Sequence, residues 1–107
     1  MAAADDAKAC WLVSDLDGRI LQAGGVLALL NVSDRSIIGR DIFLFIDKER
    51  PLFHRSMLAL SPNVTIERDF MLRPRDRKPF LARAVITRQA DDLTFWWSFS
   101  RLTQTDR

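Results

Sequence analysis

The residues of this chain that could do chemistry are few, and the first is its single histidine, His54. A neutral imidazole can bind a metal ion or transfer a proton near neutral pH. A structural zinc site needs four cysteine or histidine ligands, and the chain adds only one cysteine, Cys10, to this histidine. Acid–base catalysis needs a partner group in a pocket, and the neighbouring Ser56 would point elsewhere on a helix. The sequence therefore predicts neither a zinc site nor an enzyme.

The strongest cluster of charge is Arg73-Pro-Arg-Asp-Arg-Lys78, in a chain whose net charge is only +2. A duplex-binding domain normally gathers its basic residues on one face, whereas the charges here are interspersed. We interpret Arg73–Lys78 as a solvated hairpin turn, and the alternative is a phosphate-contacting patch of a nucleic-acid-binding α+β adaptor.

Targeting and membrane signals are missing from this sequence. The longest stretch without charge or proline, residues 20–33, is shorter than the roughly 20 apolar residues that cross a bilayer. The single cysteine suits a reducing compartment. We therefore expect a soluble, cytoplasmic protein without a membrane partner.

The first half of the chain alternates short apolar segments with turn residues. Asp15-Leu-Asp-Gly18 is typical of a hairpin turn, because glycine takes positive φ at no steric cost. Asn31 is suited to end a helix and Ser33 to begin one. The expected elements are strands at 9–14 and 19–22, short helices at 26–30 and 33–38, an apolar segment at 41–46 and a longer helix at 48–60.

The second half has the period-two alternation of β-strands. Apolar residues alternate with polar ones over 64–73, 80–88 and 93–102, separated by short turns. Three strands with short connections form an antiparallel meander. Leu93, Phe95, Trp97 and Phe99 are predicted to share the inner face of the last strand.

Four segments of the chain, found in this order, resemble the motifs of a PAS domain. They are SDLDGRIL at 14–21, NVSDRSIIGRDIFLFI at 31–46, ERDFMLRPRDRKPF at 67–80 and WWSFSRLT at 96–103. The resemblance covers residues 9–103. The chain departs from the family pattern where it leaves the last strand of the domain, a segment that we call the exit: Arg101-Leu102-Thr103 replaces Asp-Ile-Thr there. The resemblance implies an α+β fold: a five-stranded antiparallel sheet, order 2-1-5-4-3, with short helices packed on one face. Residues 1–8 would be an N-terminal arm and 104–107 the start of a linker.

The resemblance also implies a function. PAS domains are sensory and dimerisation modules of bacterial signalling proteins, such as the histidine kinases of two-component systems. The expected partners are a second copy and a covalently linked effector domain, reached through the exit at Arg101, Leu102 and Thr103. The ligand-pocket candidates are Phe43, Phe45, His54, Met57, Phe70 and Trp97.

The helix that carries His54 lines the ligand cavity in this family, and haem-binding relatives take their axial histidine from it. We expect His54 to be a boundary residue and the protein to hold no cofactor. The alternative is a haem or small-ligand receptor that uses His54. Cys10 is expected to be a small buried side chain.

Two adjacent tryptophans in the last strand must face opposite sides of the sheet. If Trp97 packs inward, Trp96 projects from the outer face, with Leu102 in the same register. An exposed indole usually marks an interface. Trp96 and Leu102 are therefore dimer-interface candidates, and the alternative is that residues 1–8 cover this face.

Overall fold

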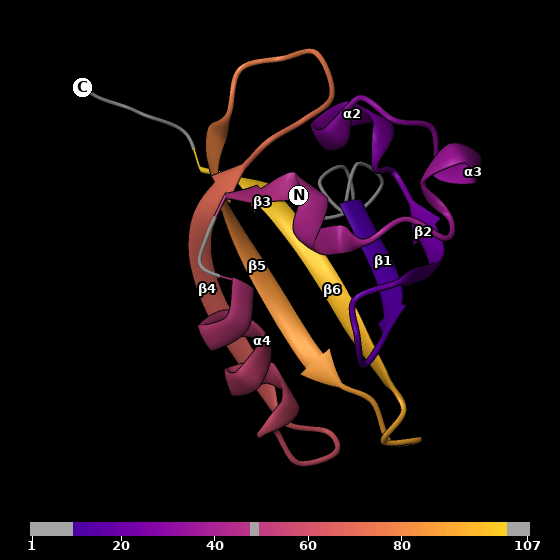
Figure 1. Ribbon diagram of the computed structural model, residues 1–107, viewed down its shortest axis with the longest axis vertical. Helices are drawn as coiled ribbons and strands as arrows, with labels where there is room; N and C mark the ends of the chain where they lie inside the picture. The colour runs from indigo at the N-terminus through magenta and orange to yellow at the C-terminus, as the bar shows by residue number, and fades with distance from the viewer. Residues whose placement is uncertain (1–9, 48–49, 103–107) are drawn as a thin grey trace, which may run out of the picture.

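The computed structural model describes residues 10–47 and 50–102, which form one antiparallel sheet with short helices over one face (Figure 1). The spatial order of the strands is β2-β1-β6-β5-β4-β3. Their bounds are β1 Cys10–Asp15, β2 Ile20–Gly24, β3 Ile46–Asp47, β4 Thr65–Leu72, β5 Phe80–Arg88 and β6 Thr94–Arg101. The five long strands have the predicted order 2-1-5-4-3, and the two-residue β3 is an additional edge beside β4. The predicted N-terminal arm, the linker at 104–107 and Thr103 lie outside the described residues.

The turn of the β1–β2 hairpin lies at Asp15–Gly18, as the sequence predicted. The Asp15 carboxylate accepts the N–H groups of Asp17 and Arg19, both at 2.9 Å, and Gly18 has a φ of 98°. A β-carbon on Gly18 would lie 2.6 Å from the Phe43 ring, so the turn packs directly on that ring. Strand β2 runs to Gly24, two residues beyond the predicted end, and pairs there with Trp11 of β1. The indole of Trp11 occupies the space that a side chain at 24 would need.

The helical segments are short, and polar side chains cap two of them. Helix α2 (Leu27–Leu30) ends at Asn31 with a φ of 58°, as predicted. Ser33 accepts the N–H of Ser36 at the start of α3 (Asp34–Ile37), and Asp41 accepts that of Phe43 in the 3₁₀ helix η1 (Ile42–Phe45). Helix α4 (Arg50–Leu58) ends two residues before the predicted Leu60. None of the helices in the described residues is long and apolar enough to span a membrane.

The inner face of the sheet carries the core. Phe95, Trp97 and Phe99 of β6 are buried, as the alternation predicted. The placement of Leu93 with them is wrong: it is 66% exposed, because the Asp91 carboxylate accepts the N–H groups of Leu93 and Thr94 and holds Leu93 in the turn. The helices close over this face, so the core lies between them and the sheet.

Candidate functional site

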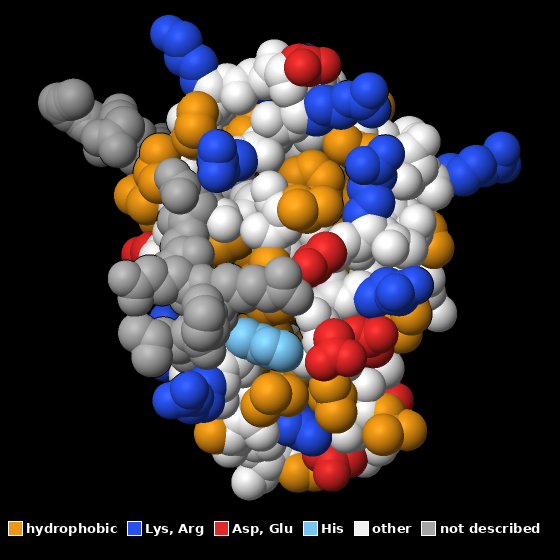
Figure 2. Space-filling model, viewed as in Figure 1, with side chains coloured by type: hydrophobic (Ala, Val, Ile, Leu, Met, Phe, Trp, Pro, Cys, Tyr) orange, Lys and Arg blue, Asp and Glu red, His pale blue; other side chains and the backbone are white. Residues whose placement is uncertain are grey.

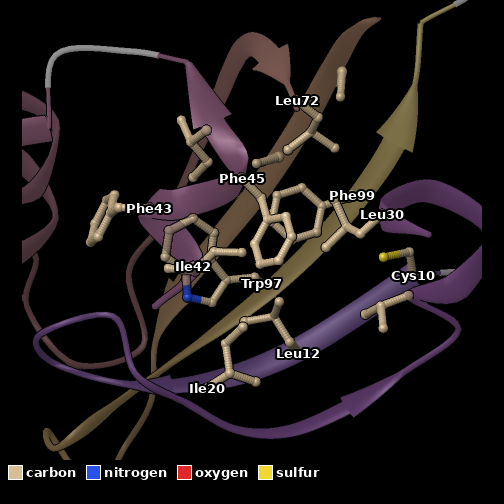
Figure 3. Close-up of a cluster of buried hydrophobic side chains, with 14 of the residues drawn as sticks. Cys10, Leu12, Ile20, Leu30, Ile42, Phe43, Phe45, Leu72, Trp97 and Phe99 are labelled. Carbon is tan, nitrogen blue, oxygen red and sulfur yellow. The ribbon is translucent and has the colours of Figure 1, made fainter. Parts of the chain in front are cut away.

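An aromatic cluster occupies the space between the helices and the sheet (Figure 3). The Trp97 ring stacks on Phe99 with centroids 5.8 Å apart and lies edge-on to Phe43 at 6.2 Å. Phe53 of α4 bridges Trp97 at 6.3 Å and Phe70 of β4 at 5.6 Å. Rings at these separations are in contact, so the centre of the domain is packed by its own side chains.

The ligand-pocket candidates of the sequence are brought together here. Phe45, Met57, Phe70 and Trp97 are buried in the same cluster as Phe43. Two pockets lined by described residues open elsewhere, one beside the β1–β2 turn and one beside α2. Because the rings of Phe43, Phe53, Phe70 and Trp97 contact one another, a ligand placed among them would have to displace aromatic rings.

A buried polar contact in this cluster was missed by the sequence reasoning. The indole Nε1 of Trp97 donates to Oγ of Ser14 at 2.9 Å, and both residues are fully buried. The Ser14 hydroxyl donates in turn to the carbonyl of Asp15 at 2.9 Å. The signal was present, because Ser14 follows Cys10 and Leu12 at a spacing of two and must share their inward face.

His54 is the sixth candidate, and it lies at the edge of the cluster. Its Nε2 is 2.6 Å from the carbonyl oxygen of Leu16, and because a carbonyl only accepts, Nε2 carries the proton and donates. The imidazole centroid is 5.3 Å from that of Phe43. His54 is thus a half-buried boundary residue that ties α4 to the β1–β2 turn. The Ser56 hydroxyl donates to the Phe53 carbonyl instead of approaching the imidazole.

The described residues do not fit haem. Haem needs a histidine nitrogen with a free lone pair facing a wide apolar pocket. Nε2 of His54 donates to Leu16, so only Nδ1 keeps a lone pair, and the aromatic side chains that would wall the pocket contact one another and leave no wide space for the macrocycle.

Cys10 lies in the core, and its thiol has low reactivity. Burial, with a smaller effect from the charge of Asp34, raises the pKa of the Cys10 thiol to about 12. The thiolate, which is the reactive form, is therefore scarce near neutral pH. Within residues 10–47 and 50–102, no three histidine, cysteine, aspartate or glutamate residues come close enough to hold a metal ion.

The outer face of the sheet carries Trp96, opposite Trp97. It is half-buried and lies between Val13 of β1 and Thr87 of β5. Trp11 and Val85, also half-buried, share this face with it. The sheet thus presents an apolar centre on the side away from the helices, which we call the outer patch: Trp11, Val13, Val85 and Trp96.

The exit of the domain lies at the end of β6. The Arg101 guanidinium sits 4.3 Å from the centroid of the Phe80 ring, and the N–H of Leu102 donates to the carbonyl of Leu81 at 3.0 Å. Leu102 is half-buried. The basic segment Arg73–Lys78 is the β4–β5 connection, a turn as predicted, and all of it is exposed except Pro74.

Solved structures share this architecture. A PAS domain of an HTR-like protein from Haloarcula marismortui has a TM-score of 0.80 at 16% identity, covering 94% of this chain and 92% of that one. The PAS domain of a LuxR-family transcriptional regulator from Burkholderia thailandensis, in complex with ethanol, gives 0.67 at 18%, covering 92% of each chain. A domain of a sensory box sensor histidine kinase/response regulator from Geobacter sulfurreducens gives 0.70 at 7%, covering 86% and 82%.

No protein-family model matches the sequence, and no curated protein matches it. The strand order and these neighbours show that the protein has the PAS fold.

Proposed function

We propose that this protein is a PAS sensory and dimerisation module of a larger bacterial signalling protein of the cytoplasm, and that it is not an enzyme. The observation that carries the proposal is the position of Trp96 and Trp97 on β6. Trp97 belongs to the aromatic cluster, Trp96 belongs to the outer patch, and the same strand ends at Arg101. The regulator and sensor-kinase origins of two fold neighbours support the signalling role.

The proposed signal is a change in packing around Trp97. Close-packed cores rearrange between discrete states rather than deforming continuously. A small ligand that moved the rings of Phe43, Phe53 or Phe70 would shift β6 and, with it, the outer patch and the exit at Arg101–Thr103. A packing change without a ligand would act through the same strand.

The proposed occupant of the outer patch is a second copy of this chain. The patch has no charged member, and tryptophan is enriched at protein interfaces. A two-fold axis would place the same apolar patch of each subunit against the other, which makes one surface complementary to itself.

Sedimentation velocity tests this interface. We expect the protein to sediment as a dimer, Trp96→Arg to sediment as a monomer, and Leu93→Arg to remain dimeric. Leu93 is the matched control, because it is an exposed apolar residue just before the same strand. Unchanged sedimentation of Trp96→Arg refutes the interface. Tighter self-association after removal of residues 1–8 would instead show that the arm covers this face.

The proposed effector domain is tested by the open reading frame. We expect coding sequence past Arg107 to continue into a kinase or another output domain. A stop codon directly after Arg107 would contradict a covalent link through the exit at Arg101–Thr103.

A further inference from the structure

A pocket of about 230 Å³ lies at the end of the molecule where the domain exits. Its walls are α2, the β4–β5 turn and the ends of β5 and β6, which lie close together in Figure 1. The residues that line the pocket include Ala28, Leu29, Arg77, Lys78, Phe80 and Arg101. Figure 2 shows lysine and arginine side chains around this end of the molecule, with apolar surface between them.

The turn that forms one wall is held in place. The N–H of Arg75 donates to the carbonyl of Leu30 at 3.0 Å, and the side-chain amide of Asn31 donates to the carbonyl of Arg75 at 2.8 Å. The N–H of Arg73 donates to the carbonyl of Phe45 at 2.7 Å. These bonds join the turn to α2 and η1, so the pocket exists before any ligand arrives.

The pocket has three cationic residues and no acidic one among those that line it. Arg101 is fixed over the Phe80 ring at 4.3 Å, a cation–π distance. The exposed Asp76 carboxylate of the β4–β5 turn lies 3.8 Å from the Arg75 guanidinium. The ion pairs between described residues thus leave Arg77, Lys78 and Arg101 unneutralised.

From this geometry we propose that the pocket binds a small organic anion. Guanidinium groups hold carboxylate or phosphate oxygens through paired, charge-assisted hydrogen bonds. Leu29 and the Phe80 ring offer an apolar wall to the rest of the ligand. The volume lies below the roughly 300–1,000 Å³ of pockets for drug-sized ligands, so the ligand is the size of one ring or a few carbons.

The pocket and the exit share Arg101. Arg101 ends β6 and is followed by Leu102, whose N–H bonds to Leu81. An anion that drew the guanidinium away from Phe80 would act on the first residues after the sheet. This coupling rests on the proposed function, whereas the binding itself does not.

Calorimetric titration of the 107-residue protein tests the site with three probes: benzoate, its neutral analogue benzamide, and inorganic phosphate. The titrations use about 10 mM salt, because exposed charges are then screened only beyond about 30 Å. We expect saturable binding of benzoate and none of benzamide. Phosphate affinity above that of benzoate would assign the site to phosphate esters, and the reverse order to carboxylates.

Three variants locate the binding. Arg101→Gln removes the stacked charge, and Ala28→Phe fills the pocket from an exposed position on α2 without changing the charge. Each should weaken benzoate at least about tenfold, the effect of losing one charge-assisted hydrogen bond or the space for the ring. Arg73→Gln, in the same turn but outside the lining and with no ion pair to another described residue, should change affinity less than twofold.

Three results would overturn the site. The first is the absence of saturable binding of both benzoate and phosphate. The second is affinity that stays within twofold in both Arg101→Gln and Ala28→Phe, each with wild-type circular dichroism. The third is displacement of benzoate by a DNA duplex whose binding falls equally in Arg73→Gln and Arg101→Gln, which would indicate a diffuse basic surface. Failure of the dimer test leaves all three readouts unchanged, so the two proposals fail separately.

Discussion

The indole of Trp97 shows how one residue depends on a distant one. Its N–H is fully buried and donates to Ser14 Oγ. A buried donor without a partner costs the free energy of its lost hydration, so the hydroxyl stabilises the fold more than its size suggests.

We predict that Ser14→Ala lowers the free energy of unfolding by about 1–3 kcal/mol, measured by urea denaturation, because Trp97 Nε1 loses its acceptor. Ser100→Ala, at an exposed position on β6, should stay within about 0.5 kcal/mol of the wild type. In a Trp97→Phe background the Ser14→Ala cost should shrink. An equal cost in both backgrounds would show that the bond contributes nothing.

The Cys10 thiol leads to a prediction about pH. Its pKa in the folded protein, about 12, lies above the ordinary value of 9.0. Its contribution to stability is therefore fully present below about pH 9 and is lost as pH rises toward 12. We expect the wild type to lose about 1.4 kcal/mol more than Cys10→Ala between pH 8 and pH 10 in urea denaturation. Parallel pH profiles of the two proteins would contradict this, because the remaining titrating groups are common to both.

At the scale of elements, α4 is held by side-chain bonds along its length. His54 donates to Leu16 in the β1–β2 turn, and Nη1 of Arg88 on β5 donates to the Leu58 carbonyl at 2.9 Å. Nη2 of Arg88 donates to the Asp92 carbonyl at 3.2 Å. The Nε of Arg88 is 2.8 Å from the Asp92 carboxylate but poorly aligned, so that contact is an ion pair rather than a hydrogen bond. The helix end is thereby joined to the β5–β6 turn.

We predict that Arg88→Lys destabilises the protein by about 1–3 kcal/mol, since lysine keeps the charge but cannot reach both carbonyls. Amide exchange at Ala59 and Leu60, just after α4, should accelerate with it. Arg55→Lys, an exposed change on α4, serves as the control and should leave exchange unaltered. If both variants behave alike, Arg88 does not hold the helix.

At the scale of the whole molecule, one core joins all the long strands. Buried residues from β1, β2, β4, β5 and β6 belong to the same cluster as those of the helices. Elements that share one core cannot unfold independently without exposing it.

We predict a single cooperative unfolding transition, with coincident midpoints in tryptophan fluorescence and far-ultraviolet circular dichroism. Fluorescence is dominated by Trp11, Trp96 and Trp97 on β1 and β6, whereas circular dichroism reports every strand. Separate midpoints would show that parts of the fold unfold independently and would contradict a single folding unit.

Much of this architecture is readable from the sequence, because local rules govern it. Alternation in β6 placed Trp97 inward and Trp96 outward, and Asn31 and Ser33 set the ends of two helices. The prediction that Leu93 faces the core was wrong. Leu93 continues the alternation in sequence, but the Asp91 carboxylate accepts its N–H and holds it in a turn.

The sequence by itself determined the strands and most of their inner faces, since these follow from periodicity and from turn residues acting over a few positions. The strand order was implied by the resemblance to PAS domains and not by these local rules. Only the tertiary structure decided the partners of His54, Trp97 and Arg101. The partners of His54 and Trp97 lie 38 and 83 residues away in sequence. Which distant atoms meet depends on strand order and register summed over the whole sheet, and no local preference encodes that sum.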